Sequence, residues 1–197
     1  SVLMGIIRTR SQLWALNTET LTAKQVQQRW PEITLPEHFC AVYEQDARYL
    51  SGESAIEHWI RLAREQGCGQ LFNCPVTAIG RQDGLQKVTT AEGEYFGRKL
   101  LVSSGSTVQT LLPGLPVTPI RKVFSWFQAD GRYSENNHFP GFSIELDDGS
   151  QYYGFPAQDN ALKAGRHDGG QPLSLNQPRP PFGSIARDGS ECFAFLR

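Results

Sequence analysis

The spacing of apolar residues predicts three helices in the first third of the chain. Four apolar residues recur at helical spacing between residues 51 and 67: Ile56, Trp59, Ile60 and Ala63. Gly67 is a natural end for this helix. A second helix is predicted to begin after Thr22 and to end before Pro31, because Thr22 and Gln25 match the capping-box pattern. Residues 1–14 carry apolar positions typical of the end of a third helix.

Alternating and β-prone segments predict strands along the rest of the chain. Strands are expected within residues 16–21, 39–44, 70–79, 85–90, 94–102, 120–128, 141–146, 151–155 and 161–167. Glu92-Gly93 is expected to join two of them as a hairpin. Residues 107–112 are predicted to form a short helix, and residues 169–182 a long Pro- and Gly-rich connection. These elements indicate an α+β fold, with an antiparallel sheet in the second half.

Composition and charge exclude several classes of protein. The chain has 197 residues, with 19 Lys and Arg against 20 Asp and Glu, so its formal net charge is −1. A general nucleic-acid binder would normally carry a basic excess. No apolar run approaches the roughly 20 residues needed to cross a bilayer, and the chain does not start with a secretory leader pattern. We therefore expect a cytoplasmic protein with no nucleic-acid or membrane partner.

The cysteines indicate no metal site. Cys40, Cys68, Cys74 and Cys192 include no C-x-x-C pair, so a structural zinc site is not expected. They are interpreted as reduced thiols of a cytosolic protein, with a disulfide pair as the alternative.

The residues most suggestive of chemistry lie in the last two predicted strands. A hairpin turning about Gln158 would place Tyr153 opposite Lys163. Because strand side chains alternate between faces, Lys163, Gly165 and His167 should share one face with Tyr153. A phenol, an ammonium and an imidazole would then surround a glycine that leaves room for a flat ligand. The same alternation also occurs on solvated sheet faces without function, and a one-residue slip in register would separate the group.

Two further segments are candidates for a binding site. Residues 98–102 are predicted to end a strand that runs into Ser103-Ser104-Gly105, and small residues at the carboxyl edge of a sheet let a ligand approach the backbone. Most such turns have no ligand. The aromatic residues between 123 and 127 are expected to pack in a core or to wall an apolar pocket.

Several separate segments agree, in order, with one protein family. They are Tyr152-Tyr153-Gly154-Phe155-Pro156 with Leu162-Lys163 and Gly165-Arg166-His167, Arg29-Trp30-Pro31-Glu32, residues 70–79, Arg121-Lys122-Val123-Phe124 and residues 128–134. On these segments the chain resembles the sarcosine oxidase family of FAD-dependent amine oxidases, from about Leu16 to Arg197. The resemblance implies a doubly wound FAD-binding domain and a substrate domain whose antiparallel sheet covers the flavin.

The resemblance implies that this chain is the central part of such an enzyme. Residues 1–68 would begin the substrate domain, residues 69–115 would pass through the FAD-binding domain, and residues 116–197 would form the antiparallel sheet of the substrate domain. The expected architecture is an α+β substrate domain with flanking helices plus part of an FAD-binding α/β domain. The G-x-G-x-x-G cradle for the pyrophosphate is absent from the sequence. Tight binding of FAD by this chain alone is therefore not expected.

The resemblance also implies catalytic residues. Tyr153 matches the tyrosine at the substrate, Lys163 the lysine beneath the flavin ring that promotes reaction with oxygen, and His167 a histidine at the substrate. Cys192 is not assigned the role of the cysteine that links FAD, because it precedes the place where the linking segment would begin.

Two positions are implied to lie near the cofactor. Val76 matches the place where the main chain of the family meets the adenine end of FAD. Gly105 matches the glycine of a small-residue turn beside the cofactor. Close relatives carry Trp two positions after this glycine, whereas this chain has Thr107.

The implied reaction is the oxidation of N-methyl amino acids by FAD and oxygen, giving an amine, an aldehyde and hydrogen peroxide. A large substrate side chain would need an aromatic wall, for which Phe124, Trp126 and Phe127 are candidates. The complete enzyme is expected to be a monomer, and self-association of this chain alone would reflect exposed apolar surface. The alternatives are a stand-alone α+β module that binds an amino acid without redox chemistry, and a protein-interaction domain.

Overall fold

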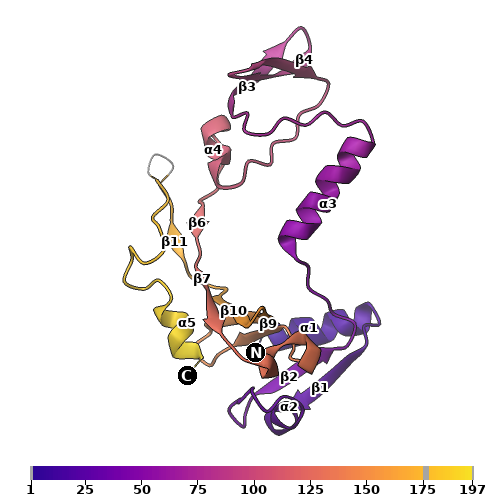
Figure 1. Cartoon of the computed structure of the whole chain (residues 1–197), viewed down its shortest axis with the longest axis vertical. Helices are drawn as coiled ribbons and strands as arrows, with labels where there is room; N and C mark the ends of the chain where they lie inside the picture. Colours follow the sequence, from indigo (N-terminus) through magenta and orange to yellow (C-terminus); the bar gives the residue numbers. More distant parts are fainter. Residues whose placement is uncertain (1, 175–177, 197) are drawn as a thin grey trace. The chain divides into compact units, whose positions relative to one another are not determined.

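The computed structural model describes residues 2–174 and 178–196, which form two compact units (Figure 1). The first unit comprises Ser1–Tyr49, Lys122–Gly170 and Pro180–Arg197, and the second comprises Leu50–Arg121 and Gln171–Arg179. Helices and antiparallel sheets occur together in the described residues, so the predicted α+β class is confirmed. The division at residues 68 and 115 stays a prediction.

The first unit opens with a two-stranded sheet and its helices. The elements are α1 (Val2–Leu13), β1 (Thr18–Thr22), α2 (Ala23–Arg29) and β2 (Cys40–Glu44). The predicted capping box is confirmed: Gln25 N donates to Thr22 Oγ1 at 3.3 Å, and Thr22 N donates to Gln25 Oε1 at 2.8 Å. Leu21, Val26 and Trp30 are buried together, so α2 is fixed on β1 by an apolar cluster.

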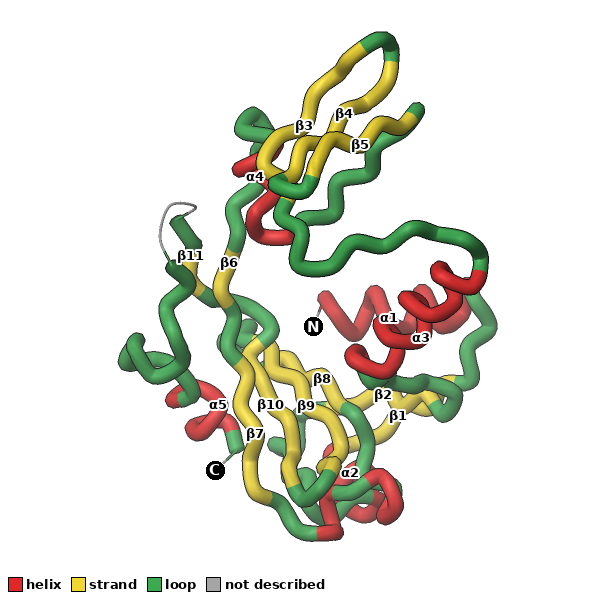
Figure 2. The backbone as a smooth tube through the Cα atoms, turned by 45° about the horizontal axis from the view of Figure 1, so that its top comes forward, coloured by secondary structure: helices red, strands yellow, loops and turns green. Residues whose placement is uncertain are grey.

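A four-stranded antiparallel sheet forms the rest of the first unit (Figure 2). In spatial order its strands are β7 (Phe124–Gln128), β10 (Ala161–Arg166), β9 (Gln151–Gln158) and β8 (Phe142–Glu145). Short 3₁₀ turns follow β7 at Gly131–Tyr133 and Glu135–Asn137. The predicted strand at residues 120–128 is interrupted, because Lys122 and Val123 separate β7 from the two-residue strand β6 (Ile120–Arg121).

The inner face of this sheet carries an apolar cluster. Leu162 and Ala164 of β10 are buried on it together with Phe139 and Ala157. Helix α5 (Ser190–Phe195) supplies the remaining aromatic contacts: Phe193 meets Phe127 at 5.1 Å between ring centroids, and Phe195 stacks on Tyr152 at 4.3 Å. We did not predict α5, since six residues are too few to show a helical period.

The hairpin that carries the candidate residues turns at Asp159 and Asn160 rather than about Gln158. Both turn residues have positive φ, 51° and 62°, as a tight two-residue turn requires. Lys163 therefore pairs with Phe155 and Gly165 with Tyr153, so the predicted pairing of Tyr153 with Lys163 is wrong by two residues. A shift of two keeps Tyr153, Lys163 and Gly165 on their predicted face, because the pleat repeats every two residues. The ladder has an irregularity between Ala161 and Lys163, nearer the turn.

The second unit contains a long helix, a three-stranded meander and several shorter elements. These are α3 (Gly52–Glu65), β3 (Val76–Gln82), β4 (Leu85–Thr90), β5 (Gly93–Gly97), a 3₁₀ turn (Gly105–Thr107), α4 (Val108–Leu111), β6 and β11 (Gln171–Pro172). Strands β3, β4 and β5 are antiparallel neighbours, and β11 pairs with β6. Of the predicted connection at residues 169–182, residues 175–177 lie outside the described part.

Two predicted strands in this unit are wrong over part of their length. Residues 70–75 come before β3 and have no strand pairing. Strand β5 ends at Gly97, and residues 98–102 have no strand pairing in the structure. Leu101 is 89% exposed. The apolar residues between 98 and 102 indicate a preference for burial, but a strand also needs a neighbouring strand to hydrogen-bond with.

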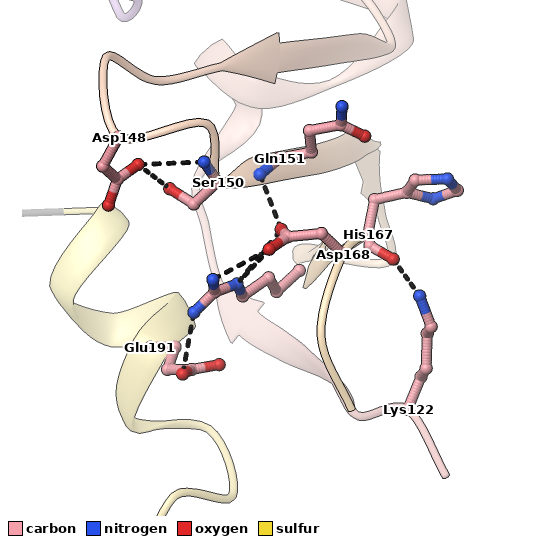
Figure 3. A network of polar contacts seen from close by, with 8 residues as sticks. Lys122, Asp148, Ser150, Gln151, His167, Asp168 and Glu191 are labelled. Atoms are coloured by element: carbon pink, nitrogen blue, oxygen red, sulfur yellow. Dashed lines mark hydrogen bonds and ion pairs between the residues drawn. The ribbon is translucent and has the colours of Figure 1, made fainter. Parts of the chain in front are cut away.

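A polar network fastens α5 and the open ends of β9 and β10 (Figure 3). Arg166 donates to Asp168 through two nitrogens and to Glu191 of α5 at 2.8 Å. Asp168 also accepts from Gln151 N at 2.6 Å, and His167 N donates to Gln151 O at 2.7 Å. Hydrogen bonds from the Arg166 guanidinium hold the pKa of Asp168 at about 2. The network therefore sets where His167 leaves the sheet.

Replacing Asp168→Asn should lower the free energy of unfolding at pH 7 by about 1–2 kcal/mol, because a charge-assisted bond to Arg166 is lost. The pKa of Asp168 is lower in the folded state than the ordinary value near 4, so its contribution is complete above about pH 4 and disappears as the pH falls through about 2. Urea unfolding from pH 7 to pH 2 should show wild type and variant converging in acid.

The matched control is Asp130→Asn. Asp130 contacts Arg132 in the same Arg–Asp geometry two residues apart, but both side chains are exposed. An exposed pair contributes little, so this variant should change stability less than Asp168→Asn. Equal losses in the two variants would contradict a role for Asp168 in fastening the sheet.

Candidate functional site

The outer face of the four-stranded sheet gathers a lysine and three aromatic rings. Lys163 of β10 lies between Trp126 of β7 and Phe155 of β9, its partners in the two ladders. Its Nζ is 4.1 Å from the ring centroid of Phe124, 5.5 Å from that of Trp126 and 5.8 Å from that of Phe155. We call these three rings the aromatic cage. Their π faces stabilise the ammonium by cation–π attraction.

The Lys163 ammonium has no acidic partner in the described part of the chain. Its side chain makes no ion pair or hydrogen bond there. The carboxylates of Asp168 and Glu191 are held instead by Arg166, which alternation places on the opposite face. All three N–H groups of Lys163 therefore remain available to an acceptor that approaches the face.

Tyr153 and His167 lie on the same face as the lysine, beside and beyond Gly165 toward the end of β10. Tyr153 is the ladder partner of Gly165, and its ring covers that glycine so closely that a Cβ there would lie 2.7 Å from Tyr153 Oη. The rings of Tyr153 and His167 meet edge to face at 6.3 Å. Burial raises the pKa of the Tyr153 phenol, so the hydroxyl stays a hydrogen-bond donor at neutral pH.

The backbone of His167 is fixed while its imidazole is exposed. His167 N donates to Gln151 O, and His167 O accepts a hydrogen bond from Lys122 Nζ (Figure 3). These two bonds anchor the residue at the end of the sheet. Its ring can therefore meet a ligand without a large change in the backbone.

The aromatic surface extends beyond the predicted residues. The ring centroids of Phe155 and Tyr49 lie 5.7 Å apart. The Tyr49 hydroxyl donates to Glu135 Oε2 at 2.8 Å. No sequence signal links Tyr49 to this face, because it lies far earlier in the chain. Phe127, a predicted wall residue, is on the inner face against Phe193, whereas Phe124 and Trp126 are on the outer face. The candidate wall therefore consists of Phe124 and Trp126.

The two predicted cofactor residues lie in the second unit. Val76 is the first residue of β3 and is exposed. Gly105 opens a 3₁₀ turn with φ of +58°. The hydroxyl of the preceding Ser104 is buried and has no hydrogen-bond partner among the described residues. Thr107 closes this turn by donating to Ser104 O at 2.8 Å. The structure thus groups Tyr153, Lys163 and His167 in one unit and Val76 and Gly105 in the other.

The described residues contain no disulfide, no metal-binding cluster and no membrane-spanning helix. All four cysteines are free thiols, and burial raises the pKa of Cys192. No group of His, Cys, Asp and Glu that could hold a metal ion occurs in the described part. None of the helices described there has the length and apolarity that a membrane span requires.

Comparison with known proteins identifies relatives of the whole chain. Residues 3–192 match the family model described as FAD dependent oxidoreductase. N-methyl-L-tryptophan oxidase of Citrobacter koseri is 52% identical over 187 residues, which cover 95% of this chain and 50% of that protein. N-methyl-L-tryptophan oxidase of Escherichia coli (strain K12) is 50% identical over 197 residues, covering 100% and 53%. The chain spans about half the length of the curated relatives it matches.

Solved structures show the same fold at low sequence identity. The open form of NikD, an unusual amino acid oxidase, superposes with a TM-score of 0.62 at 18% identity, over 84% of this chain and 44% of that chain. Glycine oxidase from Bacillus cereus ATCC 14579 superposes with a TM-score of 0.64 at 16% identity, over 89% and 47%. The mixed helix and antiparallel-sheet architecture is therefore shared with amino acid oxidases.

Gly165→Ala should displace the Tyr153 ring, because the added Cβ would lie 2.7 Å from Tyr153 Oη. The expected cost is about 1–3 kcal/mol of unfolding free energy, as for other overpacked sites. In a Tyr153→Ala background the same change should cost little, which a double-mutant cycle of urea unfolding would measure.

The matched control is Gly80→Ala in strand β3, where no atom lies within 4 Å of the added Cβ. This variant should be close to neutral. Additive effects of Gly165→Ala and Tyr153→Ala would contradict the close packing of the tyrosine over the glycine.

Proposed function

Because the chain belongs to the family of FAD-dependent oxidoreductases, we propose that it is the central part of an oxidase that demethylates N-methyl amino acids of the N-methyl-L-tryptophan type. In the proposed reaction an N-methyl amine, oxygen and water give the demethylated amine, formaldehyde and hydrogen peroxide. The methyl carbon is oxidised by two electrons and oxygen is reduced by two. The relatives at 50–52% identity support this choice of substrate.

The observation that carries the proposal is the unpaired ammonium of Lys163 in an aromatic face. FAD, when bound, supplies the redox chemistry by accepting a hydride equivalent from the amine carbon and passing electrons to oxygen. Negative charge develops when oxygen is reduced. A fixed ammonium with free N–H groups stabilises that charge, and the stabilisation is largest in a site that excludes water.

The residues present fit a flavin of this kind. Lys163 would lie beneath its ring system. In the second unit, Val76 is proposed as a residue at the adenine end of the cofactor and Gly105 as a residue near the cofactor. The buried Ser104 hydroxyl beside Gly105 has no partner in the described part and so retains a free hydrogen-bonding capacity. We accordingly propose that residues 69–115 belong to an FAD-binding domain and the flanking residues 1–68 and 116–197 to a substrate domain.

Tyr153 and His167 are proposed to position the substrate. The Tyr153 phenol, whose pKa is raised by burial, can donate to the substrate carboxylate. His167 can donate to or accept from the amine, since its ring is exposed and its backbone is fixed. Phe124 and Trp126 provide an apolar surface for a large substrate side chain. We further propose that the complete enzyme is a cytoplasmic monomer.

The complete protein should release hydrogen peroxide when given N-methyl-L-tryptophan and oxygen. Peroxidase-coupled detection, with L-tryptophan as the matched control lacking the methyl group, tests this directly. Binding of N-methyl amino acids without peroxide or formaldehyde would contradict the proposed oxidase and favour a binding module.

In the complete enzyme, Lys163→Met should slow flavin reoxidation by oxygen about 100-fold, because the charge that stabilises reduced oxygen is removed. Anaerobic flavin reduction by substrate should change far less. Stopped-flow absorbance of the two half-reactions separates these effects. Lys24→Met, on the exposed side of α2, is the control that also removes one lysine. Equal slowing of both half-reactions would exclude a specific role of Lys163 toward oxygen.

A further inference from the structure

We propose that Phe124 and Trp126 are positioning residues that hold the Lys163 ammonium in place while leaving its charge and its N–H groups unused. What Lys163 then does to oxygen rests on the proposed function. The placement of the ammonium by the two rings rests on the structure alone.

The ladder explains why Phe124 makes the shortest contact. Trp126 is the partner of Lys163, but Phe124 is the partner of Gly165, which has no side chain. Lys163 therefore reaches along the diagonal to the adjacent ring, a distance that long side chains span. Its Nζ lies 4.1 Å from the Phe124 centroid, well within the roughly 6 Å range of cation–π attraction. Phe124 and Trp126 also contact each other edge to face at 6.3 Å.

Two other lysines of this chain, Lys87 and Lys122, are held by oxygen atoms of the protein. Lys87 lies 6.0 Å from the Phe96 ring, but its Nζ pairs with Glu94 at 2.5 Å and donates to Gln82 at 3.3 Å. Lys122 donates to the main-chain oxygen of His167. In both cases an oxygen of the protein uses an N–H group. The aromatic cage instead fixes Lys163 without an oxygen acceptor from the residues that the structure describes.

This difference has a chemical consequence. A carboxylate beside Lys163 would neutralise its charge and compete with any anionic oxygen for the N–H groups. Phenyl and indole rings attract the cation through their quadrupoles but accept no strong hydrogen bond. Phe124 and Trp126 are 44% and 55% exposed, so the cage is open toward the outer face. The lysine is held from the sheet side and is accessible from the other.

The placement can be measured without turnover in the complete oxidase. Reductive ¹³C-methylation converts lysines to dimethyl-lysines, which keep their charge. The ¹H–¹³C signal of residue 163, identified by its loss in Lys163→Arg, should be shifted upfield by the ring current of Phe124. Phe124→Leu should move the signal most of the way to the position of an ordinary dimethyl-lysine. Phe96→Leu, which alters the ring near Lys87, should leave it unchanged.

A residue-163 signal at the ordinary position, or one unmoved by both Phe124→Leu and Trp126→Leu, would overturn the proposed cage. Thermal unfolding of each variant shows whether it is folded. Phe124→Tyr keeps the ring and should retain the upfield shift, so the result does not depend on the tolerance of one substitution.

Kinetics then test whether the placement matters. Phe124→Leu and Trp126→Leu should each slow flavin reoxidation by roughly 2- to 30-fold, the loss that corresponds to one cation–π contact. Both rings are also proposed to meet the substrate side chain, so anaerobic reduction is compared as its limiting rate at saturating N-methyl-L-tryptophan, which should change much less. Phe124→Tyr should restore the rate. Unchanged reoxidation in both Leu variants would overturn the positioning role. A shifted NMR signal together with no effect of Lys163→Met would keep the cage and overturn the oxygen role of the proposed function.

Discussion

The alternation of side chains along β10 is the constraint on which the candidate site depends. Leu162 and Ala164 are directed into the core, so Lys163 and Gly165 between them must face outward. Burying Lys163 on the inner face would cost the desolvation of a charge with no partner. The apolar inner residues therefore fix the face of the lysine as firmly as its own charge does. Every other feature of the site follows from which residues neighbouring strands place beside it.

The inner face gives the outer face its rigidity. Arg166 links the end of β10 to Glu191 of α5 and to Asp168, and Asp168 holds the first backbone N–H of β9. Tyr152 stacks on Phe195 directly behind this network. These contacts close one side of the sheet with aromatic packing and charge-assisted hydrogen bonds. As a result, Asp168 and Glu191 are occupied by Arg166 on the opposite side of the sheet, and neither neutralises the Lys163 ammonium.

The face of each candidate residue was predictable from the sequence, whereas its neighbours were not. The period of two along strands survives an error of two in register, so Tyr153, Lys163 and His167 were grouped correctly although the turn lies at Asp159 and Asn160. The contact of Lys163 with Phe124 depends on pairing between β10 and β7, which no local pattern specifies. Phe127 was predicted as a wall residue because the sequence alone does not show which face of the sheet each aromatic residue between 123 and 127 occupies. The strand predicted at residues 98–102 is absent because no neighbouring strand pairs with it. Helix α5 was not predicted because six residues are too few to show a helical period.

Covering the exposed aromatic face is favourable, whereas removing water from the Lys163 ammonium within it costs desolvation energy that a ligand acceptor must offset. Phe124 and Trp126 each keep about half of their surface exposed. A planar ligand laid on them would remove apolar area from water at about 25 cal/mol per Å² and would also exclude solvent from Lys163. Excluding solvent lowers the local dielectric constant, which strengthens the field of the ammonium toward any developing negative charge. The proposed binding of a flat group and the proposed action of Lys163 on oxygen would thus both depend on the same event, the removal of water from one sheet face.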